Sequence, residues 1–413
     1  MQGPGKFANY LSRKRIPNLD GLRGLAILLV LAHHAPTAAG DLAAQFQHNG
    51  KHGVSLFFVI SGYIVMTLML REYRNTESID LKGFLWRRAL RLWPLYYVIL
   101  LGESLLVYLA QVYTPENQAL FSDKLGCYVL YCTNWLENSG EGPFFVAWSL
   151  AVEEQFYLLL SLLLVFLRPA VLPIVFAGLL AAKLLLVNVA GVEPGALPWR
   201  ILLSYSEAIL LGVLLAFLLD SRRGYDAFIR VAGSPASAMV WLGTSAIFLL
   251  FVPLEHKSDL RALAFYLVCT LLVGSCAVNA RLPVIGGAAL SRVGLLSYGI
   301  YLMHMPILSA IKRVTTDPVL VSLGTFAVVL PLAWMSFVWF EEPIRRLGRK
   351  RPQDGRHVTP RRVSATAAAP TDDGLERPRA ISEAQPAIFN RPIADDEFAP
   401  AGGPVGDPSV ARQ

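Results

Sequence analysis

The sequence has 413 residues, of which 54% are hydrophobic and only 16% are charged. A soluble protein of this length carries more charge, so this composition excludes a soluble enzyme with a single anchor and indicates a membrane protein. Four cysteines are too few for a disulfide scaffold. The formal net charge of +7 is explained by a basic cytoplasmic rim and lipid headgroups rather than by binding of nucleic acid.

Apolar segments of membrane-spanning length recur along the chain and predict an all-α, polytopic membrane protein. We expect about ten transmembrane helices, at residues 20–38, 53–71, 92–112, 147–167, 170–190, 199–220, 234–254, 261–280, 293–312 and 319–340. The apolar segment 125–135 is too short to cross and is predicted to be re-entrant or interfacial. Basic residues gather at one end of these spans, which predicts that both termini lie in the cytoplasm.

The composition changes from about residue 349, where Pro, Ala, Gly and scattered charges replace the apolar pattern. Such a composition is typical of disordered segments. The predicted domains are therefore a transmembrane domain over residues 1–348 and a disordered cytoplasmic tail over residues 349–413.

The first predicted span contains two ionisable residues, Arg23 and His34. At about 100° per residue they lie within about 20° of the same helix face and about 16 Å apart along the axis, whereas His33 points about 80° away. Ionisable groups inside an apolar segment are costly and usually functional. The pair indicates one ligand stretched along the helix, with its anionic end at Arg23. The alternative is a snorkelling arginine and a core histidine.

A second basic pair, Arg88 and Arg91, lies just before the third span. Residues three positions apart are neighbours on a helix surface, and the planar guanidinium group suits phosphate. We interpret the pair as cations for an anionic ligand that reaches toward His34 from the cytoplasm. Ordinary positive-inside anchoring is the alternative.

Two carboxylates, Glu153 and Glu154, lie near the outer start of the fourth span. A carboxylate in an apolar segment needs a partner, and we expect Glu154 to orient His34, with Glu153 as the second choice. The alternative is that one glutamate faces the aqueous rim.

The ninth span carries Tyr298, Tyr301 and His304. Tyr301 and His304 lie three positions apart and share a helix face. They either line one cavity or form an interfacial tyrosine belt with a core histidine.

Six motifs occur in the order of a known family: LDGLRGLAILLVLAHH, GVSLFFVISGYIV, RRALRLWPLYY, WSLAVEEQFYL, LSYGIYLMHMP and EEPIRR. In these motifs the sequence resembles the acyltransferase family 3 membrane proteins, which O-acylate bacterial glycans and related acceptors. The resemblance implies ten helices in the bacterial inner membrane, a cytoplasmic acyl-CoA donor and a catalytic histidine at His34. It also implies ligand contacts for Arg23, Arg88 and Arg91.

The predicted protein is therefore an enzyme, an O-acyltransferase that moves an acyl group, taken as acetyl, from acyl-CoA to a hydroxyl of a carbohydrate or glycan. His34 is predicted to act as a general base or as an acyl-accepting nucleophile, oriented by Glu154. No metal and no bound cofactor are expected. A multi-span transporter or flippase of a lipid-linked or acylated sugar is the alternative. The predicted substrate-contacting residues are Arg23, Arg88, Arg91, Ser61, Glu153, Tyr298, Tyr301 and His304.

Overall fold

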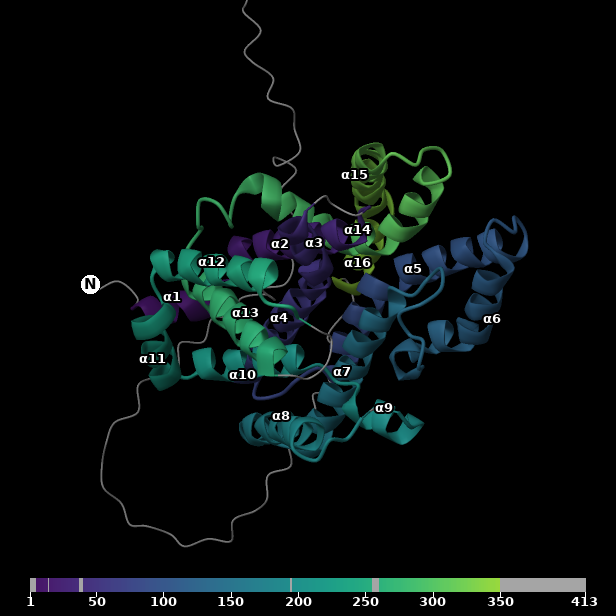
Figure 1. Cartoon of the computed structure of the whole chain (residues 1–413). Helices are drawn as coiled ribbons and strands as arrows, with labels where there is room; N and C mark the ends of the chain where they lie inside the picture. The colour runs from purple at the N-terminus through teal and green to yellow at the C-terminus, as the bar shows by residue number, and fades with distance from the viewer. Residues whose placement is uncertain (1–4, 14, 37–39, 194, 255–259, 350–413) are drawn as a thin grey trace, which may run out of the picture.

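The computed structural model of the chain describes residues 5–13, 15–36, 40–193, 195–254 and 260–349 (Figure 1). All regular elements in these ranges are helices, which confirms the all-α prediction. The predicted tail, from residue 350 onward, lies outside the described residues.

The helices follow one another along the chain as α1 (Lys6–Ser12), α2 (Pro17–His34), α3 (Asp41–Asn49), η1 (Gly50–His52), α4 (Gly53–Thr76), α5 (Leu81–Tyr108), α6 (Pro115–Leu130), η2 (Thr133–Trp135), α7 (Ala147–Phe166), η3 (Pro169–Val171), α8 (Leu172–Asn188), α9 (Leu197–Leu203), α10 (Glu207–Asp220), α11 (Arg222–Ala232), α12 (Pro235–Phe251), α13 (Leu260–Val278), α14 (Ala288–Ile311), α15 (Pro318–Ser336), η4 (Phe337–Glu341) and α16 (Glu342–Arg349).

Within the described residues, eight helical segments are long and apolar enough to cross a membrane, and ten if each of two bent pairs counts as one span. The bent pairs are α1 with α2 and α11 with α12, each bent by more than 40°. These ten candidates coincide with the ten predicted spans. The short apolar segment 125–135 falls on the end of α6 and on η2, and α6 packs against α5 instead of crossing by itself.

Several spans begin where the sequence supplies a helix-starting signal. Pro17 opens α2 and Pro318 opens α15, positions where the missing N–H of proline removes no helical hydrogen bond. The side chain of Asp317 accepts a hydrogen bond from the backbone N–H of Leu320 and so caps α15.

Two helix pairs approach closely in the centre of the bundle, α2 with α14 and α4 with α10. A Cβ added to Gly24 of α2 would overlap the carbonyl oxygen of Leu290 in α14, and one added to Gly62 of α4 would overlap the carbonyl oxygen of Ile209 in α10. Small residues at such crossings let two backbones pack directly. The close approach of α2 and α14 sets the ionisable residues of the first span against those of the ninth.

One predicted span, residues 199–220, is interrupted between α9 and α10. Lys183 of α8 lies at the interruption, where its Nζ donates to the carbonyl oxygen of Tyr205 at 2.6 Å and pairs with Glu207 at 3.1 Å. An unpaired backbone carbonyl inside a membrane is costly. The lysine from the neighbouring helix therefore stabilises the break.

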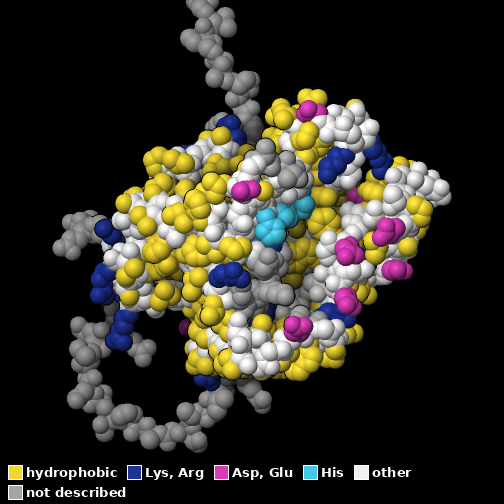
Figure 2. Space-filling view, in the orientation of Figure 1, with side chains coloured by type: hydrophobic (Ala, Val, Ile, Leu, Met, Phe, Trp, Pro, Cys, Tyr) yellow, Lys and Arg dark blue, Asp and Glu magenta, His cyan; other side chains and the backbone are white. Residues whose placement is uncertain are grey.

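The outer helices present apolar side chains outward. Figure 1 shows α5 and α6 on one flank and α11 to α13 on the opposite flank. Hydrophobic side chains cover much of the face in Figure 2. Leu101, Phe166 and Ile174 are 60%, 76% and 74% exposed. Exposed apolar side chains in such numbers suit contact with lipid.

Candidate active site

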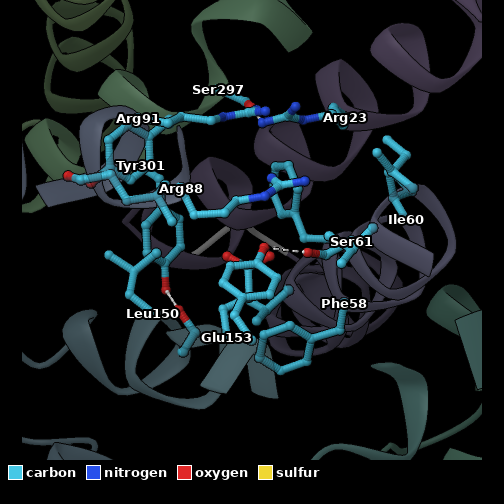
Figure 3. Close-up of a pocket in the computed structure, with 18 residues that line it drawn as sticks. Arg23, Phe58, Ile60, Ser61, Arg88, Arg91, Leu150, Glu153, Ser297 and Tyr301 are labelled. Atoms are coloured by element: carbon cyan, nitrogen blue, oxygen red, sulfur yellow. Dashed lines mark hydrogen bonds between the residues drawn. The ribbon is translucent and has the colours of Figure 1, made fainter. Parts of the chain in front are cut away.

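A cavity lies among α2, α4, α5, α7 and α14 and encloses about 770 Å³ of space not filled by atoms (Figure 3). We call it the arginine cavity. Seven of the ten predicted site residues line it: Arg23, Ser61, Arg88, Arg91, Glu153, Tyr298 and Tyr301. Helices far apart in the sequence therefore bring most of the predicted substrate-contacting residues together.

Three guanidinium groups converge on this cavity. Figure 3 shows Arg23 and Arg91 reaching toward each other beside Ser297, with Arg88 directed into the same space. Arg23 donates to the hydroxyl of Ser297 at 3.3 Å. The guanidinium carbon of Arg88 lies 5.2 Å from the ring centre of Tyr157, within the range of a cation–π contact.

None of the ion pairs among the described residues includes one of these three arginines. Like charges gathered in a partly buried space repel one another, and an anion that binds among them relieves that repulsion. Guanidinium groups also match the geometry of phosphate oxygens. The arrangement of Arg23, Arg88 and Arg91 is therefore suited to an anionic ligand, with phosphate as the best match.

The opposite wall of the cavity carries hydroxyl and carboxyl groups. The hydroxyls of Ser61 and Tyr157 lie 2.8 Å apart, and Glu153 lines the same wall. Tyr298, one of the predicted substrate-contacting residues, donates its hydroxyl to the carbonyl oxygen of Leu92. Its hydrogen atom is therefore engaged by the protein in this structure.

Tyr301 is one of the residues that line the arginine cavity. Its hydroxyl lies 2.6 Å from the hydroxyl of Ser149 and donates to the carbonyl oxygen of Val146 at 3.0 Å. Its own carbonyl oxygen contacts Nδ1 of His304 at 2.6 Å. The backbone of Tyr301 thus connects the arginine cavity to a histidine that lies outside its lining.

His34 and His304 contact each other outside the lining of the arginine cavity. Nδ1 of His34 lies 3.3 Å from Nε2 of His304 and 3.0 Å from the carbonyl oxygen of Val30. We call His34 and His304 the histidine pair. They line a second, smaller cavity with about 250 Å³ of unfilled space, bounded in part by Thr325 of α15.

The structure does not bring Glu154 to His34. Nε1 of Trp93 donates to Glu154 at 3.3 Å, and the hydrogen bonds of His34 within the described residues run to Val30 and His304. Successive residues of a helix point about 100° apart. Because Glu153 faces the arginine cavity, Glu154 is turned toward α5, and the side chain that meets His34 in the place expected for Glu154 is His304.

Three hydroxyl residues of the site were absent from the prediction: Ser149, Tyr157 and Ser297. Ser149 and Tyr157 lie one helical turn on either side of Glu153, so they share its face. This spacing in the sequence could have identified Ser149 and Tyr157 as site residues. Ser297 lies one turn before Tyr301 in the same way.

The comparisons with known proteins agree with the motifs. A family model described as an acyltransferase domain matches residues 16–339. The peptidoglycan O-acetyltransferase OatA of Listeria monocytogenes is 29% identical over 372 residues, which cover 83% of this chain and 58% of that protein. The O-acetyltransferase OatA of Staphylococcus aureus is 26% identical over 375 residues, or 84% of this chain and 60% of that protein.

The chain thus spans about three fifths of the length of these curated relatives. No solved structure matches it. Within the described residues, no group of three or more His, Cys, Asp or Glu side chains is arranged to hold a metal ion.

Proposed function

Since this chain belongs to the acyltransferase family whose model matches residues 16–339, we propose that it is a membrane-embedded O-acyltransferase. It transfers an acyl group, taken as acetyl, from acyl-CoA to a hydroxyl of a carbohydrate or glycan acceptor. The names of the two OatA relatives, both O-acetyltransferases, support the acetyl group and the oxygen acceptor.

The observation that carries the proposal is the convergence of Arg23, Arg88 and Arg91 on one cavity. Acyl-CoA presents several phosphate oxygens at one end of a long molecule. These arginines would bind the phosphates, which places the thioester at the other end of the ligand. Basic residues at the same ends of the spans favour donor entry from the cytoplasm, with the protein in the bacterial inner membrane and both termini in the cytoplasm.

His34 is the group that meets the thioester in this proposal. Eleven helical residues separate it from Arg23, a rise of about 16 Å along α2. His34 takes the proton of the acceptor hydroxyl as a general base, or accepts the acyl group first and passes it on. In the present structure Arg23 and His34 line different cavities, so the thioester has to pass from the arginine cavity to His34 in this proposal.

The test is turnover of radiolabelled acetyl-CoA by purified protein in nanodiscs, with glycan acceptors supplied. We expect transfer by the wild-type protein and its loss, by at least about 100-fold, in the His34→Ala variant. His33→Ala is the matched control, because the His33 ring packs beside His34 but its hydrogen bond runs to the backbone of Gln47 and not to the histidine pair. Equal losses in both variants at equal expression would contradict the assignment of His34. Sugar movement without acetyl-CoA turnover would identify a transporter instead.

A further inference from the structure

His304 is a buried histidine, 1% exposed, whose two ring nitrogens both have neighbours. Its Nδ1 lies 2.6 Å from the carbonyl oxygen of Tyr301, and its Nε2 lies 3.3 Å from Nδ1 of His34. Nδ1 of His34 is also 3.0 Å from the carbonyl oxygen of Val30. Four groups are therefore connected in one hydrogen-bonded chain that ends at the proposed base.

The proton positions in this chain follow from the carbonyl groups, because a carbonyl oxygen only accepts hydrogen bonds. His304 must donate from Nδ1 to Tyr301, so Nε2 of the neutral ring carries a lone pair. Nδ1 of His34 then faces two acceptors, the carbonyl oxygen of Val30 and Nε2 of His304. It must carry a proton, which leaves the lone pair of His34 on Nε2.

We infer that His304 is a positioning residue, which holds His34 in the tautomer whose Nε2 is free to act as the base. This inference rests on the proposed function. In many catalytic pairs a carboxylate accepts a hydrogen bond from the histidine and so fixes its tautomer. Here the neutral ring of His304 would accept that hydrogen bond instead.

The proton transfer proceeds through Nε2 of His34. The O–H bond of the acceptor hydroxyl breaks and an N–H bond forms on Nε2, while the acceptor oxygen bonds to the thioester carbon. The C–S bond then breaks, and the thiolate of CoA takes the proton back from His34. During this step His34 is a cation, and its bond from Nδ1 to His304 becomes charge-assisted, which strengthens it.

The surroundings of His34 make this bond important. The other titratable groups that act on it are His33, on the same helix with a ring-centre distance of 4.7 Å, and Lys312, from the far end of α14. On the side of α7 it meets the ring of Phe145 at 5.6 Å. The hydrogen-bond partners of His34 among the described residues are the Val30 carbonyl oxygen and Nε2 of His304. With a neutral His304, both accept from Nδ1 of His34 and stabilise its cation.

Three variants of the purified protein test the inference. His304→Leu removes the acceptor, whereas His304→Gln keeps a side-chain oxygen that can accept in place of Nε2. His33→Leu, which removes a neighbouring ring outside the hydrogen-bonded chain, is the control. We expect kcat to fall by about 100-fold in His304→Leu, with partial recovery in His304→Gln. KM for acetyl-CoA should stay unchanged, because His304 does not line the arginine cavity. The acidic limb of the kcat profile should move to lower pH in His304→Leu, because the cation of His34 loses an acceptor.

Several results would overturn the inference. One is an unchanged kcat in folded His304→Leu protein. Another is an equal loss of kcat in the Leu and Gln variants, which would indicate that His304 matters only for packing. The third is an effect on KM without an effect on kcat. Solid-state ¹⁵N spectra of wild-type protein with labelled histidine provide a test that needs no turnover, with the His34 signals identified by their loss in His34→Asn. A proton on Nε2 of neutral His34 would overturn the inference. Wild-type protein without acyl transfer would instead refute the proposed function, and the spectra would still decide the tautomer.

Discussion

At the scale of single residues, the arginines of the cavity differ from ordinary cationic anchors of a membrane protein. An anchor points to headgroups and water, where lysine serves as well as arginine. Arg23 and Arg91 instead point toward each other across the cavity, and Arg88 lies over an aromatic ring. Their positions fit the proposed anionic ligand better than anchoring alone.

We therefore predict that Arg88→Ala and Arg91→Ala each raise KM for acetyl-CoA by about 10-fold or more, the effect of losing a hydrogen bond to a charged group. Arg→Lys should recover part of the affinity, because lysine restores charge without the planar fork. The measurement is acetyl-CoA binding to purified protein in nanodiscs. Full recovery of acetyl-CoA affinity by lysine would show that these arginines only anchor the protein in the membrane. Unchanged acetyl-CoA binding in the Arg88→Ala, Arg91→Ala double variant would show the same.

The two adjacent glutamates are predicted to differ. Glu153→Gln should lower turnover because Glu153 lines the cavity, whereas Glu154→Gln should stay within about 3-fold of wild type, because glutamine can still accept from Trp93. Turnover at saturating acetyl-CoA, at matched amounts of folded protein, decides between them. A loss of about 100-fold in Glu154→Gln would restore the role in orienting His34 that the sequence suggested.

Helical periodicity explains which site residues could be predicted. It predicted that Tyr301 and His304 share a helix face, and their ring centres lie 5.8 Å apart. It could not show that the two residues line different cavities. It could not pair His34 with His304, since that contact depends on how α2 and α14 rotate against each other. The same limit explains why the sequence could not show that Glu154 meets Trp93 in this structure.

At the scale of the elements, the position of α2 depends on glycines at its crossing with α14. A side chain at Gly24 or at Gly294 would meet the backbone of the facing helix. The sequence shows these glycines, but it does not show which helix they face. Likewise, the interruption between α9 and α10 depends on Lys183 from another helix, so the apolar pattern alone predicted a continuous span.

Gly24→Ala is predicted to destabilise the protein by about 1–3 kcal/mol, the usual cost of overpacking, and to lower turnover by displacing Arg23 and His34. Gly102→Ala in α5 is the matched control, because a Cβ there meets nothing within 4 Å. Thermal unfolding in detergent, followed by fluorescence, measures the difference. Equal melting temperatures for the two variants would show that α2 and α14 tolerate a wider separation.

At the scale of the whole molecule, the distribution of apolar residues predicted the fold class and the candidate spans well, because a bilayer imposes a minimum length on every crossing. Details that depend on neighbouring helices could not be derived in this way. They include the bends between α11 and α12 and the π-helical turn η4 at Phe337–Glu341.

Deletion of residues 352–413 is predicted to leave acetyl-CoA turnover within about 2-fold of wild type, since polar, Pro-rich and Ala-rich segments supply no packed site. The reason lies in the composition of this segment, which is beyond the described residues. Turnover of the truncated and full-length proteins, reconstituted at equal density, provides the comparison. Loss of turnover in a normally inserted truncated protein would show that the tail takes part.

The separation of the arginine cavity from the cavity of the histidine pair has a consequence for water in the proposed reaction. A thioester is an activated compound, and water beside a catalytic histidine would hydrolyse it in place of the intended acceptor. In the proposed function, a donor held only in the arginine cavity is not yet beside His34, which lines the other cavity. The fidelity of the proposed transfer would then depend on when the thioester passes from one cavity to the other, as well as on the chemistry of His34.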